Sequence, residues 1–309
     1  PAPRLVDWRG HRVRCLTVAP EAGAGRRGPH VVLVHGFGGS IEYWRRTVPA
    51  LAGAGYTVHA LDLLGLGLSD KPADVTYSID LWAGQVVDYI EGLAEDVVLV
   101  GNSFGSLISL EATARAPGRV KGIVMLNCGV GMNNKNVAKS LKFNDLQKFL
   151  IGLVLGAVDA VLKSPLLDLI FSNFATAETV GAVLKDLYLH DPSAVDGELV
   201  EAFVAPGRTP GSVEVLRQIY TGPPGRTPME VFEKPCFDTL PLKVIWGEKD
   251  NLTPIDGDVG SFLLDLSRKR ADVDFEVISA GHIPHDDNPD AVNSSMLGWL
   301  RAEPWLADA

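Results

Sequence analysis

The sequence predicts an α/β protein with a mostly parallel central sheet, helices on both faces and an inserted helical lid. Short apolar runs typical of buried strands alternate with helical patterns from residue 30 to 127, and this alternation resumes near residue 236. Between residues 130 and 235 no convincing buried strand is recognisable. The 309 residues are 46% hydrophobic and 21% charged, a composition that suits a folded chain with a large core.

The strands are predicted from apolar runs and from alternation. Residues 4–19 alternate around Arg9-Gly10, which predicts an N-terminal β-hairpin. Continuous apolar runs are typical of strands that are buried on both faces. Such runs occur at residues 30–36, 56–63, 96–101, 122–127, 242–247 and 274–281.

Helical patterns lie between most of these strands. Residues 41–55 precede the second buried strand, and residues 78–94 precede the third, with Ser78 as the expected N-cap. Residues 106–118 follow the third strand, and this helix is expected to end at Pro117-Gly118.

The interrupted alternation divides the chain. Residues 1–129 and 236–309 are predicted to form the core, and residues 130–235 a helical lid over the strand ends. A second independent domain is the alternative, although the strand pattern resumes after the insert. Residues 146–163 form a long apolar run, which predicts a helix buried nearly all round, either lining a tunnel or within the core.

Charge and cysteine content limit the function classes. The net charge is −10 and no basic patch is visible, so no nucleic-acid partner is expected. Cys15, Cys128 and Cys236 lie far apart, which gives no disulfide framework and suits a reducing compartment. No uncharged run approaches the length of about 20 residues that a transmembrane helix needs.

One serine lies at a junction of strand and helix. Residues 101–105 read Gly-Asn-Ser-Phe-Gly directly after the strand 96–101, which matches the G-x-S-x-G nucleophile elbow. In that turn the serine side chain is lifted clear of the sheet, and the glycines avoid collisions with neighbouring backbone. Ser103 is therefore the predicted nucleophile.

A serine nucleophile needs a base and an orienting acid, and the elbow predicts the chain order Ser, Asp or Glu, His. Asp250 follows the strand 242–247, and His282 follows the strand 274–281. We expect His282 to accept the serine proton and Asp250 to hold the imidazole. Glu248 is the alternative acid, and His285 is the alternative base.

An oxyanion hole needs two backbone N–H donors. One is expected from Phe104, directly after the nucleophile, and the other from Phe37, in the glycine-rich loop after the strand 30–36. His35 is expected to shape that loop.

No cofactor or metal is expected. Residues 62–70 contain G-x-G but lack the third glycine of a dinucleotide fingerprint, so they are interpreted as a loop beside the site. A metal site was the alternative for one loop, but no further ligand cluster accompanies it. That loop carries His282, His285, Asp286 and Asp287.

Taken together, the motifs HGFGGS, DLLGLGLSDKP, GNSFG, WGEKD and AGHIPHDD resemble those of α/β-hydrolase-fold enzymes over essentially the whole chain. The resemblance implies that Ser103, Asp250 and His282 form the catalytic triad. It also implies that the N–H groups of Phe37 and Phe104 form the oxyanion hole.

A narrower resemblance rests on YSIDLWAGQVVDYI, the GNS elbow, VKGIVMLN and AGH-x-PHD. These segments are similar to the plastid and cyanobacterial branch of pheophytinases and chlorophyll dephytylases. Phe104, Ser106 and Ile283 depart from the pheophytinase pattern, which has leucine, glycine and cysteine there. The resemblance implies a phytylated tetrapyrrole substrate such as pheophytin or chlorophyll, a chloroplast location and peripheral contact with a membrane.

The leading hypothesis is a serine-dependent carboxylic ester hydrolase that removes the phytyl chain from a chlorophyll-type pigment. The alternatives are a hydrolase of other lipophilic esters, a carbon–carbon bond hydrolase and a small-molecule receptor on the same fold. A dehalogenase or an epoxide hydrolase is disfavoured, because resemblance to those enzymes implies aspartate where Ser103 stands.

Overall fold

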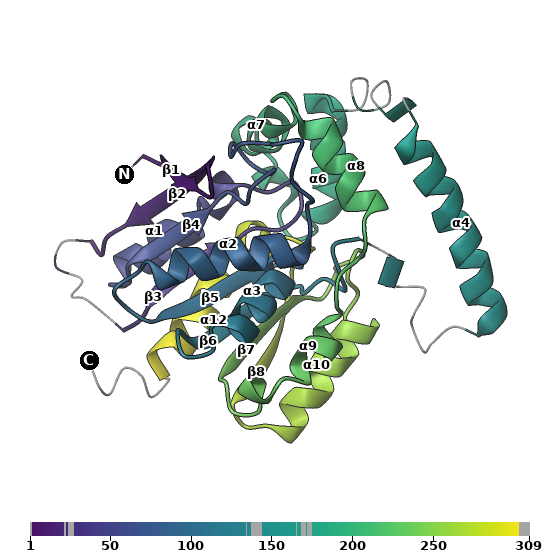
Figure 1. Cartoon of the computed structure of the whole chain (residues 1–309). Helices are drawn as coiled ribbons and strands as arrows, with labels where there is room; N and C mark the ends of the chain where they lie inside the picture. Colours follow the sequence, from purple (N-terminus) through teal and green to yellow (C-terminus); the bar gives the residue numbers. More distant parts are fainter. Residues whose placement is uncertain are drawn as a thin grey trace.

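The fold is an eight-stranded sheet covered by helices (Figure 1). The computed structural model describes residues 2–21, 23, 28–133, 135–136, 144–164, 166–167, 171 and 175–302. The strand order is β1-β2-β4-β3-β5-β6-β7-β8; β2 is antiparallel to β1 and β4, and all other neighbours are parallel. The strands are β1 Arg4–Trp8, β2 His11–Val18, β3 His30–Val34, β4 Val58–Leu61, β5 Val97–Asn102, β6 Val120–Leu126, β7 Leu242–Gly247 and β8 Val273–Ile278. The predicted fold class and all the predicted strands are confirmed.

Helices cover both faces of the sheet, which explains why its central strands are apolar throughout. Every residue of β5 is buried. On one face lie α2 (Ile79–Glu91), α3 (Phe104–Arg115) and α10 (Asp258–Lys269), whose apolar side chains share one core cluster. On the other lie α1 (Thr47–Gly53) and α12 (Pro289–Ala302), in a second cluster.

Ser78 caps α2 as its position predicts, because its side chain accepts a hydrogen bond from the N–H of Leu81 at 3.1 Å. We expect Ser78→Ala to lower the free energy of unfolding by about 1 kcal/mol, since one N–H of the first turn loses its partner. Urea denaturation measures this loss. Ser78→Asp, which keeps an acceptor, is the control; equal losses in both variants would contradict the capping role.

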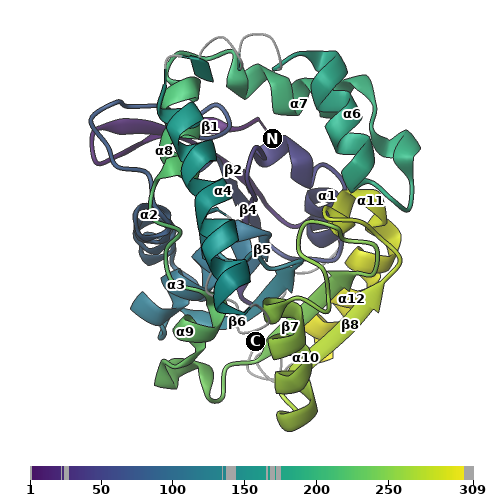
Figure 2. The same cartoon turned by 90° about the vertical axis from the view of Figure 1, so that its right-hand side faces the viewer.

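A helical insert lies between β6 and β7, where the described residues contain no strand. Figure 1 shows α6, α7 and α8 at one edge of the sheet, with α4 at the outer edge of the molecule, and Figure 2 shows that α7 lies between α6 and α8. Part of the predicted lid, including much of 164–175, lies outside the described residues. The helices of the insert are α4 Asp145–Lys163, α6 Ala177–Leu187, α7 Gly197–Gly207, α8 Ser212–Thr221 and α9 Pro228–Phe232.

The expected burial of residues 146–163 is wrong. The segment does form a helix, α4, but none of its residues is buried. Among the described elements, the helix packs mainly on α8, where Arg217 donates to the carbonyl of Leu162 at 3.2 Å, and its Asp159 pairs with Lys135 at 2.9 Å. Its other large apolar side chains are therefore 45–67% exposed: Leu146, Phe149, Leu150, Leu153, Val154, Val158 and Val161. Within the described ranges, no helix is long and apolar enough to cross a membrane.

Candidate active site

Ser103 lies at the sharp turn from β5 into α3. Its backbone has φ 56° and ψ −126°, a conformation that L-residues other than glycine rarely adopt. Such strain persists only where the surrounding structure enforces it, and it clusters at functional sites. The turn directs the Ser103 hydroxyl toward His282, whose Nε2 lies 3.0 Å from Oγ.

The two flanking glycines are required by close backbone approach. A Cβ on Gly101 would lie 2.4 Å from the carbonyl carbon of Gly105. A Cβ on Gly105 would lie 2.3 Å from the carbonyl oxygen of Val34, at the end of the neighbouring strand. The turn is therefore this tight only because both positions lack a side chain.

The loops after β7 and β8 bring two further predicted residues to Ser103. Nδ1 of His282 lies 2.8 Å from Oδ2 of Asp250. With its proton on Nδ1, His282 donates to Asp250, and its Nε2 is free to accept the hydroxyl proton of Ser103. Glu248, the alternative acid, is exposed.

His285, the alternative base, lies elsewhere in the core. Its ring stacks on Trp44 at a centroid distance of 4.1 Å, and burial lowers its pKa to about 3. The structure therefore brings His282, and not His285, to the serine.

Asp250 is held by donors that the sequence interpretation missed. Its Oδ2 accepts from Asn127 Nδ2 and Thr253 Oγ1, both at 2.5 Å, and its Oδ1 accepts from the N–H groups of Leu252 and Thr253. Burial raises the pKa of Asp250, but hydrogen bonds and the charge of His282 outweigh burial and keep the pKa below its usual value. The carboxylate therefore stays ionised at neutral pH.

Asn127 has a recognisable signal in retrospect. It ends the predicted strand 122–127 and adopts φ 46°, a left-handed conformation that asparagine tolerates better than most residues. A polar residue at the carboxyl end of a buried strand was thus available as a candidate, although nothing in the sequence linked it to Asp250.

The two predicted oxyanion donors lie in adjacent loops. Phe104 is the first residue of α3, where an N–H has no partner within the helix. Phe37 follows β3, and its ring lies 6.5 Å from that of Phe104. A Cβ on Gly36 would lie 3.1 Å from Cβ of Ser103, so the Phe37 loop passes directly beside Ser103.

His35 fixes the shape of this loop. Its Nδ1 donates to the carbonyl of Gly36 at 2.8 Å, and its Nε2 accepts from the N–H of Leu63 at 3.1 Å. Burial lowers the pKa of His35, which keeps the ring neutral and able to accept.

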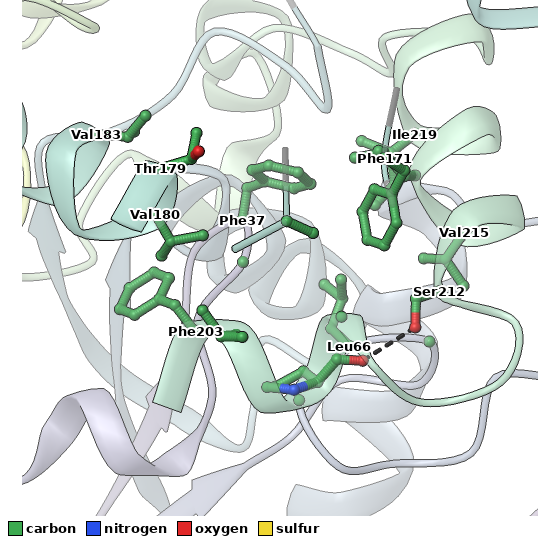
Figure 3. A pocket seen from close by; sticks show the side chains of 18 of the residues that line it. Phe37, Leu66, Phe171, Thr179, Val180, Val183, Phe203, Ser212, Val215 and Ile219 are labelled. Carbon is green, nitrogen blue, oxygen red and sulfur yellow. Dashed lines mark hydrogen bonds between the residues drawn. The ribbon is translucent and has the colours of Figure 1, made fainter. Parts of the chain in front are cut away.

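An apolar cavity of about 420 Å³ adjoins the loop of Phe37 and Gly38 after β3, which is the predicted oxyanion loop (Figure 3). Phe37 and Gly38 form part of its wall. The loop at Leu66, the helices α6, α7 and α8, and Leu167, Phe171 and Ala175 before α6 form other parts. Lys71 also lines it, but its ammonium group donates to the carbonyl of Gly67 at 2.8 Å, and burial lowers its pKa to about 8. The cavity therefore offers mainly hydrocarbon to a ligand.

The loop considered as a metal site is occupied by internal contacts. Asp286 binds Arg45 and the hydroxyl of Tyr188, and Asp287 accepts N–H groups from the segment before α7 and from Gly281. In the part of the chain that the structure describes, no group of three or more histidine, cysteine or acidic residues is placed to hold a metal ion.

A family model described as "Alpha/beta hydrolase family" matches residues 31–295. The chain belongs to this family. The matched residues include the Phe37 loop, the turn at Ser103, the helical insert and the loops that carry Asp250 and His282. Its structure accordingly has the α/β-hydrolase fold.

Relatives within the family have different substrates. Epoxide hydrolase B of Mycobacterium tuberculosis is 37% identical over 123 residues, 39% of this chain and 34% of that protein. Chloroplastic pheophytinase of Arabidopsis thaliana is 25% identical, over 88% of this chain and 61% of that protein. This chain thus spans less than two thirds of either relative.

A solved structure of the meta-cleavage product hydrolase of Pseudomonas fluorescens IP01 superposes with a TM-score of 0.67, at 22% identity over 96% of this chain and 97% of that one. At this identity the likeness shows the fold. Pheophytinase is therefore one of several distant relatives, and the expected chloroplast location is not supported.

Proposed function

We propose that this hydrolase cleaves carboxylic esters of uncharged, lipophilic substrates, with Ser103 as the nucleophile. The observation that carries the proposal is the hydrogen-bonded series Asp250–His282–Ser103, with distances of 2.8 and 3.0 Å. The loop beside Ser103 also contributes Phe37 and Gly38 to the wall of the apolar cavity. A strained serine aligned with a base and a buried acid is the arrangement that activates a hydroxyl for acyl transfer.

In the proposed reaction, Ser103 Oγ attacks the ester carbonyl while His282 Nε2 takes its proton. The N–H groups of Phe37 and Phe104 stabilise the oxyanion of the tetrahedral intermediate. His282 returns the proton to the departing alcohol, which leaves an acyl group on Ser103. Water, deprotonated by His282, then releases the acid. Asp250 stabilises the imidazolium in both steps.

The cavity supports a hydrocarbon moiety in the substrate. Each buried CH₂ contributes about 0.8 kcal/mol to binding, so a long chain gains affinity without polar contacts. The phytyl ester of a chlorophyll-type pigment is the specific candidate within this class. It is supported by the motif resemblance and by the 25% identity to pheophytinase.

A carbon–carbon bond hydrolase is the second candidate, since the same three residues serve that reaction. Its support is the fold of the meta-cleavage product hydrolase. If the substrate of a carbon–carbon bond hydrolase carries a carboxylate, the site must supply a cationic partner, because burying that charge unpaired costs free energy. Lys71 is the cationic residue among the described lining residues, and its ammonium group already binds Gly67 and Ser69. The cavity therefore favours the uncharged ester.

The test uses the wild type and Ser103→Ala with esters whose acyl or alcohol chain increases in length, and with pheophytin a and chlorophyll a, followed by chromatography. We expect Ser103-dependent hydrolysis with kcat/KM rising with the length of the chain that the cavity holds. Release of phytol would support the pigment assignment, and cleavage of simple esters alone would remove it. Tight ligand binding without Ser103-dependent turnover would overturn the enzyme proposal in favour of a receptor.

A further inference from the structure

One tyrosine hydroxyl connects the loops around Ser103. Tyr43 lies in the 3₁₀ turn η1 (Ile41–Trp44), after the oxyanion loop, and is almost completely buried. Its hydroxyl accepts from the N–H of Gly36 at 2.8 Å and donates to Oδ1 of Asn102 at 2.9 Å. Burial raises the pKa of Tyr43, so the hydroxyl keeps the proton that it donates.

Both bonded groups are next to residues of the proposed reaction. Gly36 precedes Phe37, and Asn102 precedes Ser103. The same Asn102 side chain donates through Nδ2 to the carbonyl of His282 at 3.1 Å. One buried series of hydrogen bonds therefore joins Gly36 and Asn102, the residues that precede Phe37 and Ser103, to the backbone carbonyl of His282.

The ring of Tyr43 is fixed from several sides. It contacts the ring of His285, in the loop that carries His282, edge-on with a distance of 4.5 Å between ring centroids. The centroid of the Trp44 ring lies 5.0 Å away. It also contacts Phe203 of α7, at 6.2 Å, and Phe203 lines the apolar cavity. These contacts leave the hydroxyl one position, between Gly36 and Asn102.

We propose that Tyr43 is a positioning residue that aligns the oxyanion loop with Ser103 and His282 through Asn102. Without its hydroxyl, the N–H of Gly36 and Oδ1 of Asn102 would be unpaired in the interior, and an unpaired buried polar group is costly. The two loops then shift to find other partners. A displacement near 1 Å at reacting groups can lower a rate about 100-fold. This inference rests on the proposed function.

The test is Tyr43→Phe, which removes one oxygen atom and keeps the ring. We expect kcat for a p-nitrophenyl ester to fall roughly 10- to 100-fold while KM changes by less than about 2-fold, because alignment matters most in the transition state. The rate at which a fluorophosphonate labels Ser103 is expected to fall as well. Tyr89→Phe is the matched control.

The Tyr89 hydroxyl binds Nδ1 of His59 at 2.8 Å, near the amino ends of the strands and away from Ser103. Tyr89→Phe should lower the melting temperature but leave kcat unchanged. Equal effects of the two variants on kcat, or a loss carried by KM alone, would overturn the proposal. If the wild type and Ser103→Ala hydrolysed the ester at the same rate, that result would instead overturn the proposed function.

A double-variant cycle of Tyr43→Phe with Asn102→Asp tests the connection through Asn102. Asn102→Asp keeps an acceptor for Tyr43 but loses the amide donor to the carbonyls of His282 and Leu126. If Tyr43 acts through Asn102, the double variant loses less activity than the product of the two single losses. Independent, multiplicative losses would contradict the connection.

Discussion

Ser103→Ala is expected to lower kcat for the best ester by roughly 10⁴- to 10⁶-fold while leaving the fold intact. The variant removes the only atom that forms the covalent bond in the proposed reaction, and neighbouring water is not activated in its place. The residual rate would come from the oxyanion donors and from substrate binding. KM should change little, since the hydroxyl contributes mainly to the transition state.

Steady-state kinetics and a melting curve measure the two parts of this prediction. Ser109→Ala is the control: its hydroxyl donates to the carbonyl of Gly105 at 2.8 Å within α3, so it removes a buried serine hydroxyl of the same helix. We expect that control to keep activity near the wild type. Ser103→Ala with more than about a tenth of wild-type kcat would exclude Ser103 as nucleophile.

Gly105→Ala is expected to give the largest loss of stability among simple substitutions at the elbow. The added Cβ would lie 2.3 Å from the carbonyl oxygen of Val34 and 2.6 Å from that of His35. Both atoms belong to the backbone of β3 and the oxyanion loop, so neither moves without displacing a central strand. We expect a loss of about 3 kcal/mol or more in the free energy of unfolding, or no folded protein.

Urea denaturation compares this variant with Gly298→Ala. Gly298 lies inside α12, and a Cβ there would meet nothing within 4 Å. That control should be stabilised by roughly 0.5–1 kcal/mol, because alanine is the better helix former. A Gly105→Ala protein as stable as the wild type would show that the elbow tolerates a side chain and that the close approach is not required.

The order of elements and the positions of the candidate residues were accessible from the sequence. Continuous apolar runs identified the buried strands, since strands covered on both faces need apolar side chains throughout. In a parallel sheet, the carboxyl ends of strands meet at one edge. Ser103, Asp250 and His282 each follow such a strand, so their proximity follows from local pattern and topology together.

Other features depend on contacts between distant parts of the chain. Asn127 meets Asp250 across 123 positions, and Asn102 meets His282 across 180. No periodicity encodes which polar side chain faces which, because that depends on the relative placement of strands and loops. Tyr43 looked like any buried aromatic residue, and only the fold brings its hydroxyl between Gly36 and Asn102.

The helix α4 also shows that burial depends on contacts that the local sequence does not encode. Its apolar run correctly predicted a helix, because helix formation depends on local spacing and on residues with high helix propensity. Burial depends on neighbours, and among the described elements α4 packs mainly on α8. The sequence by itself therefore determined the elements, their order and the residues at the strand ends. The tertiary structure decided which side chains are covered and which polar groups meet, because burial and hydrogen bonding are properties of pairs of segments.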